Sequence, residues 1–273
     1  GIFFLYIKDM APGPVVFYQL LFGFLALAVY LAATGKLSGM KLRGKRLALM
    51  LLGAWQAGVM LSYYTAVSFT NVSLSVLLLY TAPLYILLIA PIFLKEKPGE
   101  KSVIALIISL VGVVIVVGPK NLVLSQAGFE SGYLFGVLMG LFAGFFYACI
   151  IITSRYLRDE YSGLEQLFFS TGVTIILLLL FVRKVSTASL VDNLPVLLFL
   201  GVMITSIGSI LYFTGLVHVK AQNASIISLL EPVSTIFFAY LILKEPITAE
   251  TLLGCLLILS SSLLVSLEDK SET

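Results

Sequence analysis

The feature that most constrains this chain is a series of long apolar stretches separated by short, charged linkers. A bilayer core about 30 Å thick is crossed by a helix of about 20 residues. Nine stretches reach roughly that length, at residues 14–34, 46–69, 72–94, 102–118, 132–154, 163–182, 194–217, 221–243 and 250–267. The alternating pattern of a membrane β-barrel does not occur along the sequence. The sequence therefore predicts an all-α polytopic membrane protein.

Composition supports this fold class and excludes several others. Hydrophobic residues make up 60% and charged residues 11% of the 273 residues, whereas soluble globular chains have about 45–50% and about 25%. An ordinary soluble enzyme, a nucleic-acid-binding protein and a disordered protein are excluded, and the expected partner is the lipid bilayer. Cys149 and Cys255 lie within apolar stretches and have no disulfide or metal-ligand spacing. We therefore expect no metal and no cofactor.

An internal repeat indicates the domain organisation. A shift of 149 positions aligns the two halves without a gap, and it matches Tyr63 with Tyr212, Thr65 with Thr214, Pro83 with Pro232, Ala90 with Ala239, and Leu94-Lys95-Glu96 with Leu243-Lys244-Glu245. Residues 1–120 and 130–268 are thus expected to be two repeats. Residues 1–7 are apolar but too short to span a membrane. We interpret them as the end of a first helix that is truncated in this chain; a short interfacial segment is the alternative.

The repeat predicts ten helices in a 5+5 arrangement. Because five is odd, the second repeat enters the membrane in the opposite sense, and such inverted repeats are typical of transporters. Loops on one side of this topology carry 12 of the 17 Lys and Arg residues. The positive-inside rule therefore places the C-terminus in the cytoplasm.

Two motifs carry a resemblance to a known family. Tyr80-Thr81-Ala82-Pro83 precedes Leu94-Lys95-Glu96, and Leu229-Leu230-Glu231-Pro232-Val233 precedes Leu243-Lys244-Glu245-Pro246. This pattern resembles the drug/metabolite transporter superfamily, and within it the EamA-type ten-helix transporters. The resemblance implies a plasma-membrane carrier of small metabolites such as amino acids, amines, sugars or drugs, often an exporter, with a central cavity between the repeats.

Other functions remain as alternatives at this point. The runner-up is an exchanger of phosphate-bearing substrates from the same superfamily, which would require Lys or Arg in the cavity. A channel is a further alternative, although no ring of carbonyls or charges is evident. An intramembrane enzyme would need a second catalytic group beside Glu231, so we expect no enzymatic activity and no catalytic residue.

Glu231 is the most informative single residue. All 17 basic residues and 13 of the 14 acidic residues lie at the ends of spans or in loops. Glu231 instead lies ten residues beyond Ala221, which is about 15 Å along a helix and near the bilayer midplane. A charge there costs at least about 2.5–3.5 kcal/mol. We predict that it faces a central cavity and binds a substrate ammonium group or a proton; the alternative is a protonated, purely structural side chain.

Pro83 and Pro232 are predicted to interrupt their helices at the site. Each removes one backbone donor, which leaves the carbonyl groups of Leu79 and Ser228 without their usual partners. Matched interruptions point to a transporter binding site, although a packing kink is equally compatible with the sequence. Ser228 and Thr235 are predicted to share a polar stripe with Glu231.

Aromatic and polar residues of one span complete the predicted substrate-binding set. Trp55, Gln56 and Tyr63 lie within 46–69, and Thr205 and Tyr212 are the repeat partners of the last two. They are candidates for the wall of the cavity, where rings hold cations; filling of helix contacts is the alternative. Gly132, Gly136, Gly140 and Gly144 form a ridge that allows close helix packing. The partner of this ridge is either another helix of the chain or a second subunit of a homodimer.

Overall fold

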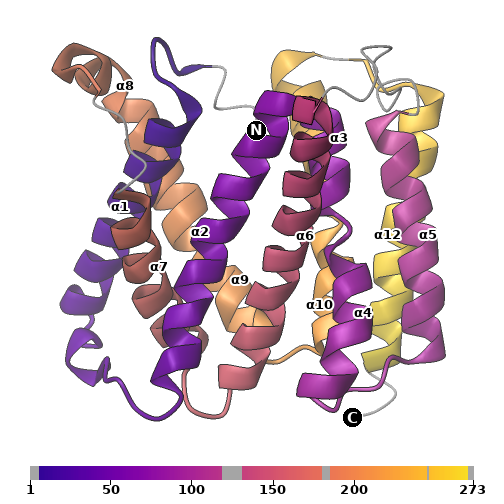
Figure 1. Cartoon of the computed structure of the whole chain (residues 1–273), viewed down its shortest axis with the longest axis horizontal. Coiled ribbons are helices and arrows are strands. Elements are labelled where there is room, and N and C mark those ends of the chain that lie inside the picture. The colour runs from indigo at the N-terminus through magenta and orange to yellow at the C-terminus, as the bar shows by residue number, and fades with distance from the viewer. Residues whose placement is uncertain (1–5, 119–130, 180–184, 245, 270–273) are drawn as a thin grey trace. The chain divides into compact units, whose positions relative to one another are not determined.

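The computed structural model describes residues 6–118, 131–179, 185–244 and 246–269, which form helices and connecting loops (Figure 1). The helices of the first sequence half are α1 (Pro12–Ala33), the 3₁₀ turn η2 (Leu37–Gly39), α2 (Arg46–Phe69), α3 (Val72–Leu79), α4 (Ala82–Phe93) and α5 (Glu100–Val117). Those of the second half are α6 (Ser131–Leu157), α7 (Gly163–Leu179), α8 (Thr187–Phe199), the π-helix η4 (Leu200–Gly208), α9 (Ser209–Leu216), α10 (Ala221–Ser228), α11 (Glu231–Phe238), the π-helix η5 (Ala239–Leu243) and α12 (Ala249–Asp269).

Most of the predicted spans are present as apolar helices. Eight helices of the described part are long and apolar enough to cross a membrane, and α7 is apolar but shorter, with 17 residues. The span predicted to begin at residue 194 begins earlier, because α8, η4 and α9 form one helical run, Thr187–Leu216. The expected remainder of a first helix lies largely outside the described residues. The chain is a multi-pass membrane protein.

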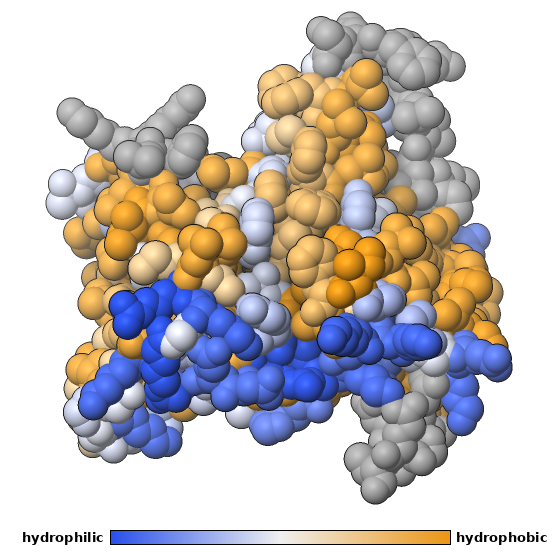
Figure 2. All heavy atoms as spheres, turned by 60° about the horizontal axis from the view of Figure 1, so that its bottom comes forward, coloured by the Kyte–Doolittle hydropathy of each residue, from blue (hydrophilic) through white to orange (hydrophobic). Residues whose placement is uncertain are grey.

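The helices form two compact units. The first unit contains residues 3–57 and 153–218, and the second contains residues 58–152 and 219–273. Each unit therefore takes helices from both halves of the sequence. In Figure 2, hydrophilic residues gather at the loops and helix ends that come forward, and hydrophobic residues cover the flanks of the helices.

Close backbone contact holds the first unit together. Helix α1 packs most extensively against η4, and the two meet at Gly23 and Gly201. A Cβ on Gly201 would lie 2.9 Å from the carbonyl oxygen of Gln19, and one on Gly23 would lie 2.6 Å from Thr205 Cβ. Only glycine allows the two helices to approach this closely.

The start of α7 is stabilised by a capping box. Ser162 Oγ accepts from the Glu165 amide (3.3 Å), and Glu165 Oε2 accepts from the Ser162 amide (2.9 Å). The other carboxylate oxygen of Glu165 pairs with Arg43 at 2.6 Å. These reciprocal bonds satisfy donors that a helix start leaves unpaired, and the ion pair joins the α1–α2 loop to α7 within the first unit.

The second unit is organised around α5 and α12, which lie side by side (Figure 1). They cross at Gly112 and Gly254, where a Cβ on either residue would lie 2.8 Å from the carbonyl oxygen of the other. Helix α10 packs against α4, α5 and α12. The predicted glycine ridge of α6 also lies in this unit. Gly140 packs against Leu78, and Gly144 packs against the Leu78 carbonyl and Thr81, so the partner of these two glycines is the α3–α4 segment of the same chain.

Candidate functional site

Two membrane-spanning helices of the second unit are interrupted at corresponding residues. Helix α3 ends at Leu79 and α4 begins at Ala82, while α10 ends at Ser228 and α11 begins at Glu231. The amides of Thr81 and Leu230, which are 149 residues apart, donate to the carbonyl groups three residues earlier at 3.1 and 3.0 Å. Pro83 and Pro232 each occupy the second position of the new helix, where the missing donor is tolerated. The predicted helix interruptions are therefore present.

The offset of 149 residues between the two repeats also relates the ends of these helices. Lys95 and Lys244, the lysines of the two Leu-Lys-Glu motifs, both adopt the left-handed backbone conformation, with φ of 58° and 59°. This conformation is uncommon for a residue other than glycine. Each lysine lies just past the end of its helical segment.

Glu231 lies at the second interruption and is exposed, although it is the first residue of a helix in the middle of a membrane-spanning segment. The hydroxyl group of Tyr80, which lies at the first interruption, is close enough to the Glu231 carboxylate to interact with it. Tyr80 is itself buried, and it packs with Val113, Leu229 and Ile258. A buried tyrosine hydroxyl thus lies beside an exposed carboxylate.

Two further tyrosines of the second unit lie near this pair. Tyr63 of α2 is close enough to Glu231 for an electrostatic interaction, and Tyr147 of α6 is similarly close to Tyr80. A carboxylate beside several aromatic rings is suited to a cationic group, since ring faces and carboxylates both attract positive charge. Anionic groups such as phosphates prefer Arg and Lys.

The predicted polar stripe is divided by the interruption. Ser228 is the last residue of α10, and its hydroxyl donates to the Ala224 carbonyl at 2.9 Å. Thr235 lies with Glu231 on α11, one helical turn away, and is exposed. The helical spacing that linked Ser228 to Glu231 in the sequence therefore does not hold across the break, whereas the spacing from Glu231 to Thr235 does.

The remaining candidates belong to the first unit, where two of them join helices. Gln56 Nε2 donates to Ser170 Oγ (3.2 Å), and Thr174 Oγ1 donates to Gln56 Oε1 (2.9 Å), so both ends of the Gln56 amide bind α7. Gln19 Nε2 of α1 donates to Thr205 Oγ1 at 3.1 Å. Trp55 and Tyr212 are half-buried. Among the described residues, no three His, Cys, Asp or Glu side chains gather into a group that could hold a metal.

Tyr80 is the functional candidate that sequence reasoning missed. It stands in the motif Tyr80-Thr81-Ala82-Pro83, but a tyrosine by itself is a weak signal in a chain that contains 13 of them. Its position immediately before a proline-containing helix interruption was the available signal. Its partner in the repeat, Leu229, has no polar group, so the shift did not point to it.

Comparison with known proteins agrees with this architecture. A transporter of Clostridium kluyveri, described as uncharacterized, is 28% identical over 261 residues, covering 93% of this chain and 83% of that protein. An uncharacterized transporter of Archaeoglobus fulgidus is 26% identical, with 92% and 85% covered. One protein of known crystal structure has the same fold, with a TM-score of 0.77, 17% identity, and coverage of 95% of this chain and 90% of that chain.

The family assignment follows from a match that covers most of the chain. The pattern of the EamA-like transporter family matches residues 2–118 and again residues 134–267. The two matches begin and end close to the two repeats read from the sequence. The chain belongs to the EamA-like transporter family.

Proposed function

We propose that this protein exports small metabolites with a positively charged group, such as amino acids, amines or cationic drugs, by alternating access. The observation that carries the proposal is the pair formed by Tyr80 and Glu231, because it places an oriented carboxylate at two matched helix interruptions. Broken helices at mid-membrane depth are typical of transporter binding sites. The carboxylate favours a cation or zwitterion over the phosphate-bearing substrates of the alternative.

The architecture that we propose for this activity is ten helices in two inverted repeats, residues 1–120 and 130–268. The matching helix interruptions and the matching left-handed lysines support the repeat. We further propose a plasma-membrane location with the C-terminus in the cytoplasm, on the basis of the Lys and Arg distribution.

Within this proposal, the residues have different roles. Glu231 binds the cationic group, and Tyr80 orients the Glu231 carboxylate. Tyr63 and Thr235 line the same site in the second unit. Ser228, Pro83 and Pro232 maintain the interrupted backbone. Trp55, Gln56, Thr205 and Tyr212 remain candidate substrate-binding residues in the first unit, with Gln56 and Thr205 also holding helices together.

The test is counterflow in proteoliposomes with three labelled probes: leucine as a zwitterion, tetraethylammonium as a permanent cation and glucose 6-phosphate as a phosphate ester. We expect saturable exchange of leucine or tetraethylammonium. Glu231→Gln, which keeps the shape but removes the charge, should reduce that exchange at least about tenfold, equivalent to about 1.4 kcal/mol.

The matched control is Glu250→Gln, because Glu250 is an exposed acid in the first turn of α12. This variant should exchange the probes like the wild type. Exchange of glucose 6-phosphate alone would contradict the substrate class. Wild-type exchange by Glu231→Gln between pH 5 and pH 8 would contradict the role of the charge.

A further inference from the structure

The first turn of α10 lacks an N-cap of its own. Its N-cap position is Lys220, which makes no side-chain cap hydrogen bond, and a lysine side chain has no acceptor to offer. The corresponding residue of the first repeat is Asn71, whose Oδ1 accepts from the Leu74 amide at 2.8 Å and caps α3. The two repeats therefore differ at the start of the interrupted helix.

The missing cap is supplied by a different part of the chain. Glu96 Oε2 accepts from the Ala221 amide at 3.0 Å, and the Glu96 backbone carbonyl accepts from Gln222 Nε2 at 3.3 Å. Glu96 directly follows Lys95, whose left-handed conformation ends the α4 segment. A charged carboxylate at a helix N-terminus is favourable both as a hydrogen-bond acceptor and through the helix dipole.

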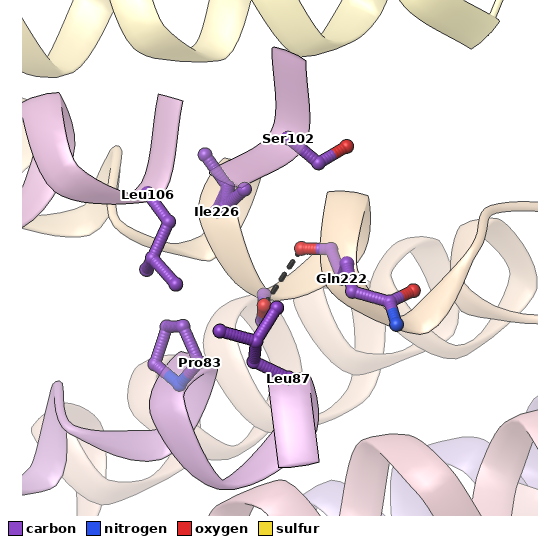
Figure 3. A pocket seen from close by; sticks show the side chains of 7 residues that line it. Pro83, Leu87, Ser102, Leu106, Gln222 and Ile226 are labelled. Atoms are coloured by element: carbon purple, nitrogen blue, oxygen red, sulfur yellow. Dashed lines mark hydrogen bonds between the residues drawn. The ribbon is translucent and has the colours of Figure 1, made fainter. Parts of the chain in front are cut away.

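The surroundings show that α10 depends on these contacts. Residues 221–226 are all buried, so an unpaired amide in this turn would be costly. Ser102 Oγ of α5 donates to Asn223 Oδ1 at 2.9 Å. Figure 3 shows Pro83 and Leu87 of α4 opposite Gln222 and Ile226 of α10, around a cavity of only about 10 Å³. The helices are therefore in close contact along this surface.

The other end of α10 is attached to the start of α4. Leu229, which follows α10, packs with Tyr80 in a buried apolar cluster, and Tyr80 lies just before α4. Both ends of α10 are thus fixed to the two ends of α4, with Glu96 at one end and Tyr80 at the other. Glu231, the first residue of α11, lies only three positions after the last residue of α10.

We infer that Glu96 is a positioning residue, which clamps α10 to the end of α4 and thereby holds Glu231 in its orientation against Tyr80. The inference rests on the proposed function for what Glu231 does, but the clamp itself does not depend on a substrate. It assigns a role to the first Leu-Lys-Glu motif: the motif caps the interrupted helix of the other repeat.

Hydrogen–deuterium exchange of the purified protein tests the clamp without a substrate, because exchange reports local opening. Glu96→Ala should speed exchange of residues 221–224 about fivefold, as expected for the loss of one N-cap. It should also speed exchange of residues 230–235, because the segment that carries Glu231 is released. Glu100→Ala, which removes an exposed acid a few residues away, should change neither region.

A second substitution separates a clamp from a simple cap. Lys220→Asn introduces the local cap that Asn71 provides in the first repeat. In Glu96→Ala/Lys220→Asn, we expect residues 221–224 to regain protection from exchange, while residues 230–235 continue to exchange as fast as in Glu96→Ala. If the double variant restores both regions, or if Glu96→Ala affects only the first turn or neither region, the positioning role is wrong.

Two controls make the result independent of folding yield and of the transport proposal. If Glu96→Ala does not yield folded protein, Glu96→Gln takes its place, because glutamine keeps a hydrogen-bond acceptor but has no charge. Glu96→Gln should speed hydrogen–deuterium exchange of residues 221–224 and 230–235 to a smaller extent. No increase in exchange in this variant would overturn the clamp. The expected exchange pattern combined with normal probe counterflow by Glu231→Gln would leave the clamp standing and overturn the proposed function alone.

Discussion

The contact between the Tyr80 hydroxyl group and the Glu231 carboxylate offers the most direct test of the site. Tyr80→Phe removes the hydroxyl group but keeps the ring, which packs with Val113, Leu229 and Ile258. The apolar contacts of the ring should therefore survive. Hydrogen bonds to charged groups contribute about 1.5–3 kcal/mol. A loss of about 1.5 kcal/mol, at the lower end of this range, should lower the transport efficiency about tenfold.

A double-mutant cycle measures whether the two residues act together. The transport efficiency, kcat/KM for counterflow of leucine or tetraethylammonium, is determined for the wild type, Tyr80→Phe, Glu231→Gln and the double variant. Because the hydroxyl is expected to act through the carboxylate, Tyr80→Phe should have little further effect once Glu231 is replaced. The coupling free energy should exceed about 1 kcal/mol, whereas independent sites add within about 0.5 kcal/mol.

Tyr85→Phe is the matched control for this cycle. Tyr85 is a half-buried tyrosine on α4 whose ring contacts Phe145 edge to face, with ring centroids 5.7 Å apart. Its replacement should leave counterflow unchanged. Additive effects of Tyr80→Phe and Glu231→Gln, or equal losses in Tyr85→Phe and Tyr80→Phe, would refute the assignment of Tyr80 as the residue that orients Glu231.

Two further predictions concern packing and topology. Gly201→Ala should lower the free energy of unfolding in detergent by about 1–3 kcal/mol, and with it the melting temperature. The reason is that its Cβ would lie 2.9 Å from the Gln19 carbonyl oxygen and from the Gly23 amide nitrogen. The control is Gly215→Ala, which should not destabilise the protein because nothing lies within 4 Å of the added Cβ. An unchanged melting temperature in Gly201→Ala would contradict the close α1–η4 contact. Single cysteines at Ser38 and Ser271 should resist impermeant thiol reagents in intact cells and react after lysis, and labelling of both from outside would reverse the proposed orientation.

Much of the fold could be predicted from the sequence because its determinants are local. The length of an apolar stretch decides whether a helix can cross a bilayer, and the predicted spans correspond to apolar helices in the described part of the chain. Proline acts on its own helix, so Pro83 and Pro232 located both interruptions. Glu231 was recognisable because an ionisable residue at that depth is unusual in any membrane helix.

Pairings between residues could not be predicted, because helical periodicity describes one face of one helix and does not identify what lies opposite. The sequence placed Ser228 and Glu231 on one stripe, but the chain is not helical between them. Gln56 was a candidate for substrate binding, yet both ends of its amide bind α7.

The sequence by itself therefore determined a polytopic helical membrane protein, the repeat pattern and the one acidic residue in the middle of a predicted span. Only the tertiary structure decided that Tyr80 is the partner of Glu231 and that Glu96 caps α10. The physical reason is that these contacts join residues more than 120 positions apart, and chain folding rather than local spacing brings such residues together.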